Sequence, residues 1–285
     1  MAGPVSGKKI LLVGASGRMG LAITRAAAES RQLRIVAAVD RPDDGVRPPV
    51  QGRDLGTLAG LAPLGIAVGA DLDAALAGAA GNGETPDVMI DFSSPASTAA
   101  HLAACARAHV AALVGTTGLG ADAEAAAQSA AARVPVLIAA NTSVGVTLLA
   151  ELVRAAARAL PAEFDIEILD AHHRAKVDAP SGTALALGRA AAEGRGIDHD
   201  TARLPIERDG ARREGGIGYS VVRAGDIVGE HEVVFAAAGE RVVLGHIATD
   251  RTIFARGALR AADWLAIQSP GRYSMVDFLG LKTAV

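Results

Sequence analysis

Four ionisable side chains lie within five positions of the chain, directly after the apolar run EILDA. His172 and His173 are adjacent, and Arg174 and Lys176 follow them. An imidazole titrates near neutrality and suits general acid–base catalysis, whereas a lysine supplies a proton or a fixed positive charge. Because ionisable groups are costly to bury, we expect this cluster at the exit of a strand, facing a cleft.

Ser181, Gly182 and Thr183 follow this cluster and have the composition of a helix start. Hydroxyls and free N–H groups at such a start form an anion site that suits a carboxylate, so we predict a substrate with one or more carboxylates. If the intervening turn is helical, His172 and Lys176 approach each other. A solvated basic loop is one alternative.

Metal binding by the paired histidines is another alternative. Adjacent residues on a strand point to opposite faces, and the sequence has neither an HExxH motif nor a cysteine partner for such a site. We therefore predict no metal.

The segment KKILLVGASGRMGLAITRAAAES has the order strand, glycine turn, helix. Gly14, Gly17 and Gly20 form G-x-x-G-x-x-G, which departs from the more usual G-x-G-x-x-G. Glycines let backbone N–H groups approach a pyrophosphate, and the new helix presents its positive dipole end there. The alternative is an ordinary tight turn between a strand and a helix.

The second predicted strand, RIVAAVD, ends at Asp40, twenty positions beyond Gly20. A carboxylate at this place accepts hydrogen bonds from ribose hydroxyls, which favours NAD. The guanidinium of Arg41 instead suits a 2′-phosphate, which favours NADP. The two together indicate loose or dual coenzyme preference, unless they are a solvated charge pair.

Two further loops follow predicted strands, GTT at 115–117 and AANTSVG at 139–145. Ligands collect at the carboxyl ends of parallel strands, so we expect both loops on the nicotinamide side of the crevice. Helix capping explains Asn141 or Ser143 equally well.

The elements that position these residues alternate between strand-like and helix-like segments from residue 9 to about 140. The strands are continuously apolar, which is typical of a parallel sheet buried on both faces. They are expected at 9–15, 34–40, 88–93, 111–116 and 134–141. Helices are expected between them at 19–30, 94–109 and 119–133.

After residue 141 the pattern changes to a helix at 144–160, a strand at 164–173, a helix at 181–194 and an antiparallel-style meander within 216–249. A final helix at 252–268 carries Trp264 on its apolar face. We predict an α/β protein with a Rossmann-type doubly wound parallel sheet domain at 1–141, on which the C-terminal segment 253–285 packs back. A smaller α+β domain with a mixed or antiparallel sheet is predicted at 142–252.

The bulk composition narrows the class of protein. The chain has 285 residues, half of them hydrophobic but only 3% aromatic, and a net charge of −3. This balance argues against a nucleic-acid-binding surface, and no apolar stretch approaches the ~20 residues of a membrane span. The single cysteine, Cys105, excludes an intrachain disulfide and fits a reducing compartment, so we expect a soluble cytoplasmic protein.

The motifs GASGRMG, DFSSP, GTTG, AANTSVG, AHHRAKVDAPSGTAL and RAGDIVGEH occur in this order. In this the chain resembles the dihydrodipicolinate reductase family over nearly its whole length. The resemblance implies reduction of a cyclic dicarboxylated imine to tetrahydrodipicolinate with NADH or NADPH, in lysine and diaminopimelate biosynthesis. It also implies a homotetramer formed through the sheet of the second domain.

The resemblance further implies roles for individual residues. His172 would be the acid/base and Lys176 the proton donor, and the substrate would be held by His173, Lys176, Ser181, Gly182 and Thr183. The coenzyme would be held by Gly14, Ala15, Ser16, Gly17, Arg18, Met19, Asp40, Arg41, Gly115, Thr116, Thr117, Ala139, Ala140, Asn141 and Thr142.

Two residues depart from the family pattern: Asp40 replaces a glutamate of some members, and Thr142 an aromatic residue of some relatives. Two other functions compete with the reductase. One is a two-domain dehydrogenase acting on aspartate or an aspartate-derived semialdehyde. The other is a non-catalytic NAD(P) sensor, against which the presence of His172 and Lys176 argues.

Overall fold

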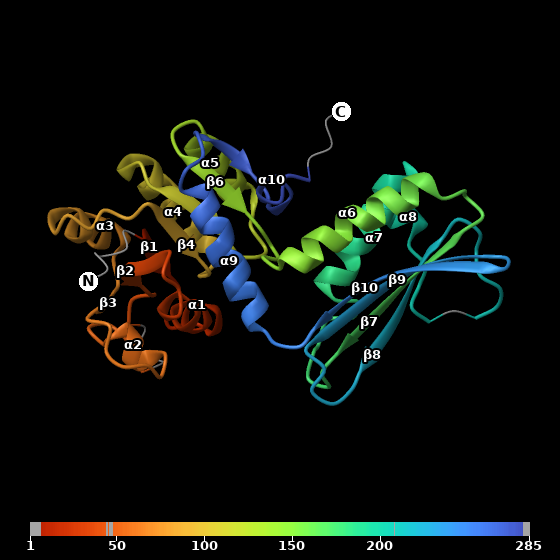
Figure 1. Cartoon of the computed structure of the whole chain (residues 1–285), viewed down its shortest axis with the longest axis horizontal. Helices are drawn as coiled ribbons and strands as arrows, with labels where there is room; N and C mark the ends of the chain where they lie inside the picture. Colours follow the sequence, from red (N-terminus) through yellow and green to blue (C-terminus); the bar gives the residue numbers. More distant parts are fainter. Residues whose placement is uncertain (1–6, 44, 46–47, 208, 282–285) are drawn as a thin grey trace. The chain divides into compact units, whose positions relative to one another are not determined.

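The computed structural model describes residues 7–281 except 44, 46, 47 and 208. The described chain forms two compact units (Figure 1). The first comprises the described residues up to Ser143 together with those from Thr252 onward, and the second is Val144–Arg251.

Within the described residues, the first unit contains a parallel sheet of seven strands. Its first strand in the chain, β1, has β2 on one side and β4 on the other, so the chain winds outward from β1 in both directions. This is the doubly wound arrangement that the apolar runs predict. In spatial order the strands are β11 (Gly271–Tyr273), β6 (Pro135–Ile138), β5 (Ala111–Val114), β4 (Val88–Asp91), β1 (Lys8–Val13), β2 (Leu33–Val39) and β3 (Val68–Gly69).

Helices cover both faces of this sheet, because alternate side chains of each strand point to opposite sides. In β1, Ile10 and Leu12 join one core and Leu11 and Val13 the other. The first core includes α1 (Arg18–Ala28), α9 (Thr252–Leu265) and the short helices α2 (Leu55–Leu58) and α10 (Met275–Phe278). The second core includes α3 (Leu72–Gly81), α4 (Pro95–Ala108) and α5 (Ala121–Ala131).

The second unit contains, among its described residues, a mixed sheet of four strands. Their spatial order is β10 (Glu240–Ala248), β9 (Gly229–Ala237), β7 (Asp165–His172) and β8 (Ile217–Arg223). The predicted fold class, a doubly wound parallel sheet plus a smaller domain with a mixed or antiparallel sheet, is confirmed.

The predicted antiparallel meander is wrong for β8. This strand pairs with β7 in parallel, whereas β9 pairs with the other edge of β7 in antiparallel fashion, so β8 and β9 are not neighbours. The physical reason is α7 (Gly182–Arg195), which lies between β7 and β8 in the chain. A helical crossover of this kind returns the next strand in the same direction.

One face of this mixed sheet packs against α6 (Val144–Ala159) and α7 in a hydrophobic core, to which α8 (His199–Ala202) adds a residue. On the opposite face the exposed large apolar side chains are Leu169, Val222, Val243 and Ile247. No helix in the described part of the chain has both the length and the apolar character needed to cross a bilayer.

Candidate active site

The glycine turn after β1 is built for close backbone contact. Gly14 has φ +76°, and a Cβ on it would lie 2.4 Å from the carbonyl oxygen of Phe92, which follows β4. A Cβ on Gly20 would lie 2.3 Å from the carbonyl oxygen of Gly14. Both positions therefore require glycine, and the result is that α1 begins directly against the turn with its N-terminal N–H groups next to the end of the sheet.

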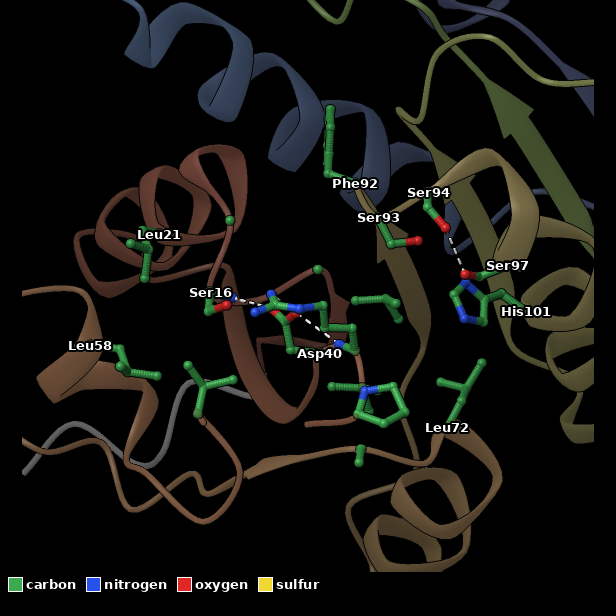
Figure 2. Close-up of a pocket in the computed structure, with 18 of the residues that line it drawn as sticks. Ser16, Leu21, Asp40, Leu58, Leu72, Phe92, Ser93, Ser94, Ser97 and His101 are labelled. Carbon is green, nitrogen blue, oxygen red and sulfur yellow. Dashed lines mark hydrogen bonds and ion pairs between the residues drawn. The ribbon is translucent and has the colours of Figure 1, made fainter. Parts of the chain in front are cut away.

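A pocket of about 680 Å³ lies at the carboxyl ends of β1, β2 and β4 (Figure 2). Asp40 closes one side of it: its buried carboxylate accepts hydrogen bonds from the backbone N–H of Ser16 at 2.6 Å and of Arg41 at 2.8 Å. The end of β2 is thereby tied to the glycine turn. The predicted residues Gly14, Ser16, Gly17, Asp40 and Arg41 all line this pocket.

A second hollow of about 520 Å³ continues from Gly17 along the same edge of the sheet. Its lining includes predicted residues from the start of α1 and from two loops: Arg18, Met19, Gly115, Thr116, Thr117, Ala140, Asn141 and Thr142. Thr142 is buried and its hydroxyl donates to the carbonyl of Phe254 at 2.8 Å. Ala15 and Ala139 are also buried, but they line neither cavity.

Sequence reasoning assigned no role to the segment DFSSP, which begins at the last residue of β4. Asp91 is fully buried there, accepts from the N–H of Ser93 at 2.9 Å, and lies 2.9 Å from Nδ1 of His101. Ser93, Ser94 and His101 line the first pocket (Figure 2). The rule that predicted the loop at 115–117 applies here too: polar residues directly after a buried parallel strand lie at the edge of the sheet where ligands bind.

In the second unit, the clustered residues separate into two environments. His172 ends β7 and is buried beside Asp170, whereas His173 is half-buried and its Nε2 lies 2.9 Å from Nη2 of Arg251. The segment between His172 and Lys176 is a turn and not a helix, so a helical spacing does not bring these two side chains together. Lys176 places its ammonium 2.8 Å from Asp178.

Ser181 is the N-cap of α7, in agreement with the helix start predicted from the sequence Ser-Gly-Thr at 181–183. Its Oγ accepts from the N–H of Ala184 at 3.1 Å, and its own N–H donates to Oδ2 of Asp170 at 2.7 Å. Gly182 is exposed and Thr183 half-buried in the first turn of this helix. The start of α7 is thus anchored on the same buried carboxylate that neighbours His172.

The charges around this carboxylate set its protonation and that of His172. Burial opposes ionisation of Asp170, but hydrogen bonds from His231, Ser181 and Arg223 together hold its pKa well below the usual value. Burial lowers the pKa of His172 to about 4; Asp170 raises it, and His231, Lys176 and Arg223 lower it further. His172 is therefore neutral at pH 7 while Asp170 is charged.

Asp170, His172 and His231 each offer a donor atom, and these atoms lie within 4.8 Å of one another. A shared cation would meet the guanidinium of Arg223, whose Nη2 lies 3.0 Å from Oδ2 of Asp170, and like charges at this range repel. We assign no metal ligand among them, and the absence of a metal stays a prediction.

Comparison with known proteins identifies the family. The family model "Dihydrodipicolinate reductase, N-terminus" matches residues 8–142, and "Dihydrodipicolinate reductase, C-terminus" matches 145–279. A protein of Alkalilimnicola ehrlichii named 4-hydroxy-tetrahydrodipicolinate reductase is 49% identical over 275 residues, covering 96% of this chain and 99% of that protein. A Cereibacter sphaeroides protein of the same name is 50% identical over 279 residues, covering 95% of this chain and 98% of that protein.

The solved structure "Dipicolinate bound Dihydrodipicolinate reductase from Paenisporosarcina sp. TG-14" superposes with a TM-score of 0.74 at 22% identity, over 95% of this chain and 98% of that one. The chain belongs to the dihydrodipicolinate reductase family.

Proposed function

We propose that this protein reduces 4-hydroxy-tetrahydrodipicolinate (dihydrodipicolinate) to tetrahydrodipicolinate with NADH or NADPH, in lysine and diaminopimelate biosynthesis. The observation that carries the proposal is the match to reductases of this name at 49–50% identity across both units. The name of the solved relative also records bound dipicolinate, a small dicarboxylate. The cationic cluster and the start of α7 suit such a ligand.

The first unit is proposed to bind the coenzyme, which supplies the hydride when bound. The residues fit this group, because Gly14 and Gly20 leave no room for a side chain where the turn meets β4 and α1. The start of α1 suits the pyrophosphate, and Asp40 suits the adenosine ribose hydroxyls. Arg41 lies beside Asp40, with Nη1 4.0 Å from Oδ1, so that a 2′-phosphate also finds a cation.

The second unit is proposed to bind the substrate. Lys176 and His173 would hold a carboxylate together with Ser181, Gly182 and Thr183 at the start of α7. During reduction a ring carbon conjugated to the imine gains the hydride and the ring nitrogen system gains a proton. Lys176 is the proposed donor of that proton, because His172 is neutral at physiological pH and accepts or relays protons more readily than it supplies them.

Self-association is proposed through the outer face of the mixed sheet. Leu169, Val222, Val243 and Ile247 come from three of its four strands and are 38–63% exposed in the described chain. An apolar patch of this kind marks a surface that another protein covers, which supports the expected homotetramer. We also propose a cytoplasmic location, which the single buried cysteine fits.

The activity is tested by following NADPH or NADH absorbance with the condensation product of pyruvate and aspartate semialdehyde. We expect loss of absorbance with this product and no reduction of NAD by aspartate. The opposite pattern would favour an aspartate dehydrogenase, and coenzyme binding without either reaction would favour the sensor.

Variants then test the residue assignment. His172→Gln is expected to lower kcat by roughly 10²-fold with coenzyme Kd unchanged, since positioned acid–base groups contribute on this order. Lys176→Ala is expected to lower kcat and also raise KM for the substrate. Arg174→Gln is the matched control, because Arg174 belongs to the same basic cluster but is exposed. A kcat for His172→Gln equal to that of this control would remove His172 from the mechanism.

A further inference from the structure

We propose that Asp170 is a positioning residue that holds His172 in the tautomer with its proton on Nδ1, while the same carboxylate fixes the start of α7. The catalytic meaning of this arrangement rests on the proposed function. The arrangement itself rests on the buried contacts of three strands and one helix in the second unit.

The strand geometry brings the groups together. Asp170 and His172 are two residues apart in β7, so both side chains point to the face that packs on the helices. Oδ1 of Asp170 lies 3.0 Å from Nδ1 of His172. His231 is paired with Asp170 across β9, and its Nε2 lies 3.3 Å from the same Oδ1.

Among Asp170, His172 and His231, three buried atoms lack a hydrogen-bond partner within the described part of the chain: Oδ1 of Asp170, Nδ1 of His172 and Nδ1 of His231. The first two face each other. Leaving a buried acceptor and a buried ring nitrogen unpaired is unfavourable, because both have given up their hydrogen bonds to water. At 3.0 Å a modest rotation of the imidazole directs an Nδ1–H onto Oδ1 and satisfies both atoms. Nε2 is then the unprotonated nitrogen that remains for proton exchange.

The other contacts of the Asp170 carboxylate leave Oδ1 facing an imidazole. Its Oδ2 accepts from the N–H of Ser181 at 2.7 Å and from Arg223 at 3.0 Å, which leaves Oδ1 for an imidazole. His231 also faces Oδ1, with its Nε2 at 3.3 Å, but this nitrogen has Oγ of Ser181 as a second partner at 3.1 Å. Nδ1 of His172 has no such second partner, so His172 is the ring whose orientation depends on Asp170.

The consequence is that two parts of the proposed substrate site share one anchor. Through Oδ1 the carboxylate orients His172, and through Oδ2 it holds Ser181, the N-cap of α7. A change at Asp170 is thus expected to disturb proton transfer and carboxylate binding together. His172 acts on the substrate directly, and Asp170 acts only through it and through the helix.

The tautomer is read directly by long-range ¹H–¹⁵N correlation spectra of the full-length protein labelled with [¹⁵N]histidine, with the His172 signals assigned by their loss in His172→Gln. We expect the wild-type ring to carry its proton on Nδ1. Asp170→Asn offers an amide N–H to Nδ1 and is expected to move the proton to Nε2, with kcat at least tenfold lower. Asp170→Glu keeps the charge and is expected to retain the Nδ1–H tautomer. His231→Gln is the matched control and is expected to leave the tautomer unchanged.

A wild-type His172 ring protonated on Nε2 would overturn the proposal, and this spectrum does not depend on any variant folding. An unchanged tautomer in Asp170→Asn, or a changed one in His231→Gln, would also overturn it. So would stoichiometric metal in the purified protein, because a cation on Nδ1 replaces the proton. The spectra need no turnover, so a protein without reductase activity but with the expected tautomers refutes the proposed function alone.

Discussion

Replacing Arg223 by glutamine would leave the most deeply buried carboxylate of the second unit without its cation. Nη2 of Arg223 lies 3.0 Å from Oδ2 of Asp170 and 2.7 Å from the carbonyl oxygen of Asp178. The Asp170 side chain is 0% exposed and that of Arg223 is 16% exposed, so water screens the pair little. In Arg223→Gln the carboxylate keeps Ser181 as a donor but loses the opposite charge.

The magnitude follows from the distance and the burial. At 3.0 Å the Coulomb attraction is about 5.5 kcal/mol at an effective dielectric constant of about 20, part of which desolvation offsets. Removing one partner of a buried pair costs about 3–5 kcal/mol, because an uncompensated charge is left behind. We expect Arg223→Gln to lower the free energy of unfolding of the second unit by about 3 kcal/mol at pH 7.5.

The loss should depend on pH, with a definite sign. In the wild type the pKa of Asp170 is lowered, so its contribution is present above the unfolded pKa and is lost only as pH falls through the folded one. In the variant the Asp170 carboxylate keeps Ser181 and His231 but loses its cation, so we expect its pKa to lie above the wild-type value and the carboxyl to take up a proton at a higher pH. The destabilisation should therefore be smaller at pH 4.5 than at pH 7.5.

Hydrogen exchange measured by mass spectrometry resolves the two units. The single tryptophan, Trp264, lies in α9 of the first unit, so its fluorescence does not report on Asp170. A loss of 3 kcal/mol corresponds to roughly 10²-fold faster exchange in peptides of β7 and β9, with the first unit unchanged. The matched control is Arg154→Gln, whose partners Glu151 and Glu193 are partly exposed, and it should cost about 1 kcal/mol or less. Equal effects of the two variants, or no difference between the two pH values, would refute the reasoning.

Two further predictions concern the glycine turn and the outer face. Gly20→Ala should lower the Tm reported by Trp264 fluorescence and weaken coenzyme binding at least tenfold. The new Cβ would lie 2.3 Å from the carbonyl oxygen of Gly14, and overpacking of this kind costs about 1–3 kcal/mol. Gly78→Ala, in α3 with nothing within 4 Å of the new methyl group, should leave binding unchanged and raise Tm slightly; equal losses in both would contradict the packing argument. Val243→Glu should shift the mass measured by light scattering to a smaller assembly, because Val243 is 52% exposed on the outer face of the mixed sheet. Ile267→Glu, at a 69% exposed apolar residue of the first unit, is its control, and an unchanged mass in Val243→Glu would rule that face out.

The coenzyme half of the site was open to prediction from sequence because its signals are local. A glycine turn directly after a continuously apolar strand places Gly14 and Gly20 where a side chain would clash with the backbone, and Gly17 where a Cβ would lie 3.2 Å from the carbonyl oxygen of Gly14. The loops at 115–117 and 139–145 follow from the rule that the carboxyl ends of parallel strands share one edge. The contacts of Asp40 with the backbone N–H of Ser16, and of Asp91 with His101, could not be predicted, because each depends on how two different elements pack against each other.

The substrate half shows why sheet order limits such prediction. Strand periodicity alone indicates that Asp170 and His172 share a face of β7, but not what they meet there. The segment RAGDIVGEH answers this once the order is known: it begins at Arg223, the last residue of β8, and ends at His231 in β9. Because β7 lies between these two strands, the segment crosses the end of β7 (Figure 1). It thereby brings the guanidinium of Arg223 to one side of Asp170 and the imidazole of His231 to the other. In the expected meander β8 and β9 would be neighbours, and the two groups would not bracket Asp170 from opposite sides. Arg223 is 53 residues from Asp170 in the chain, and the two residues at the ends of this segment meet Asp170 because β7 passes between β8 and β9.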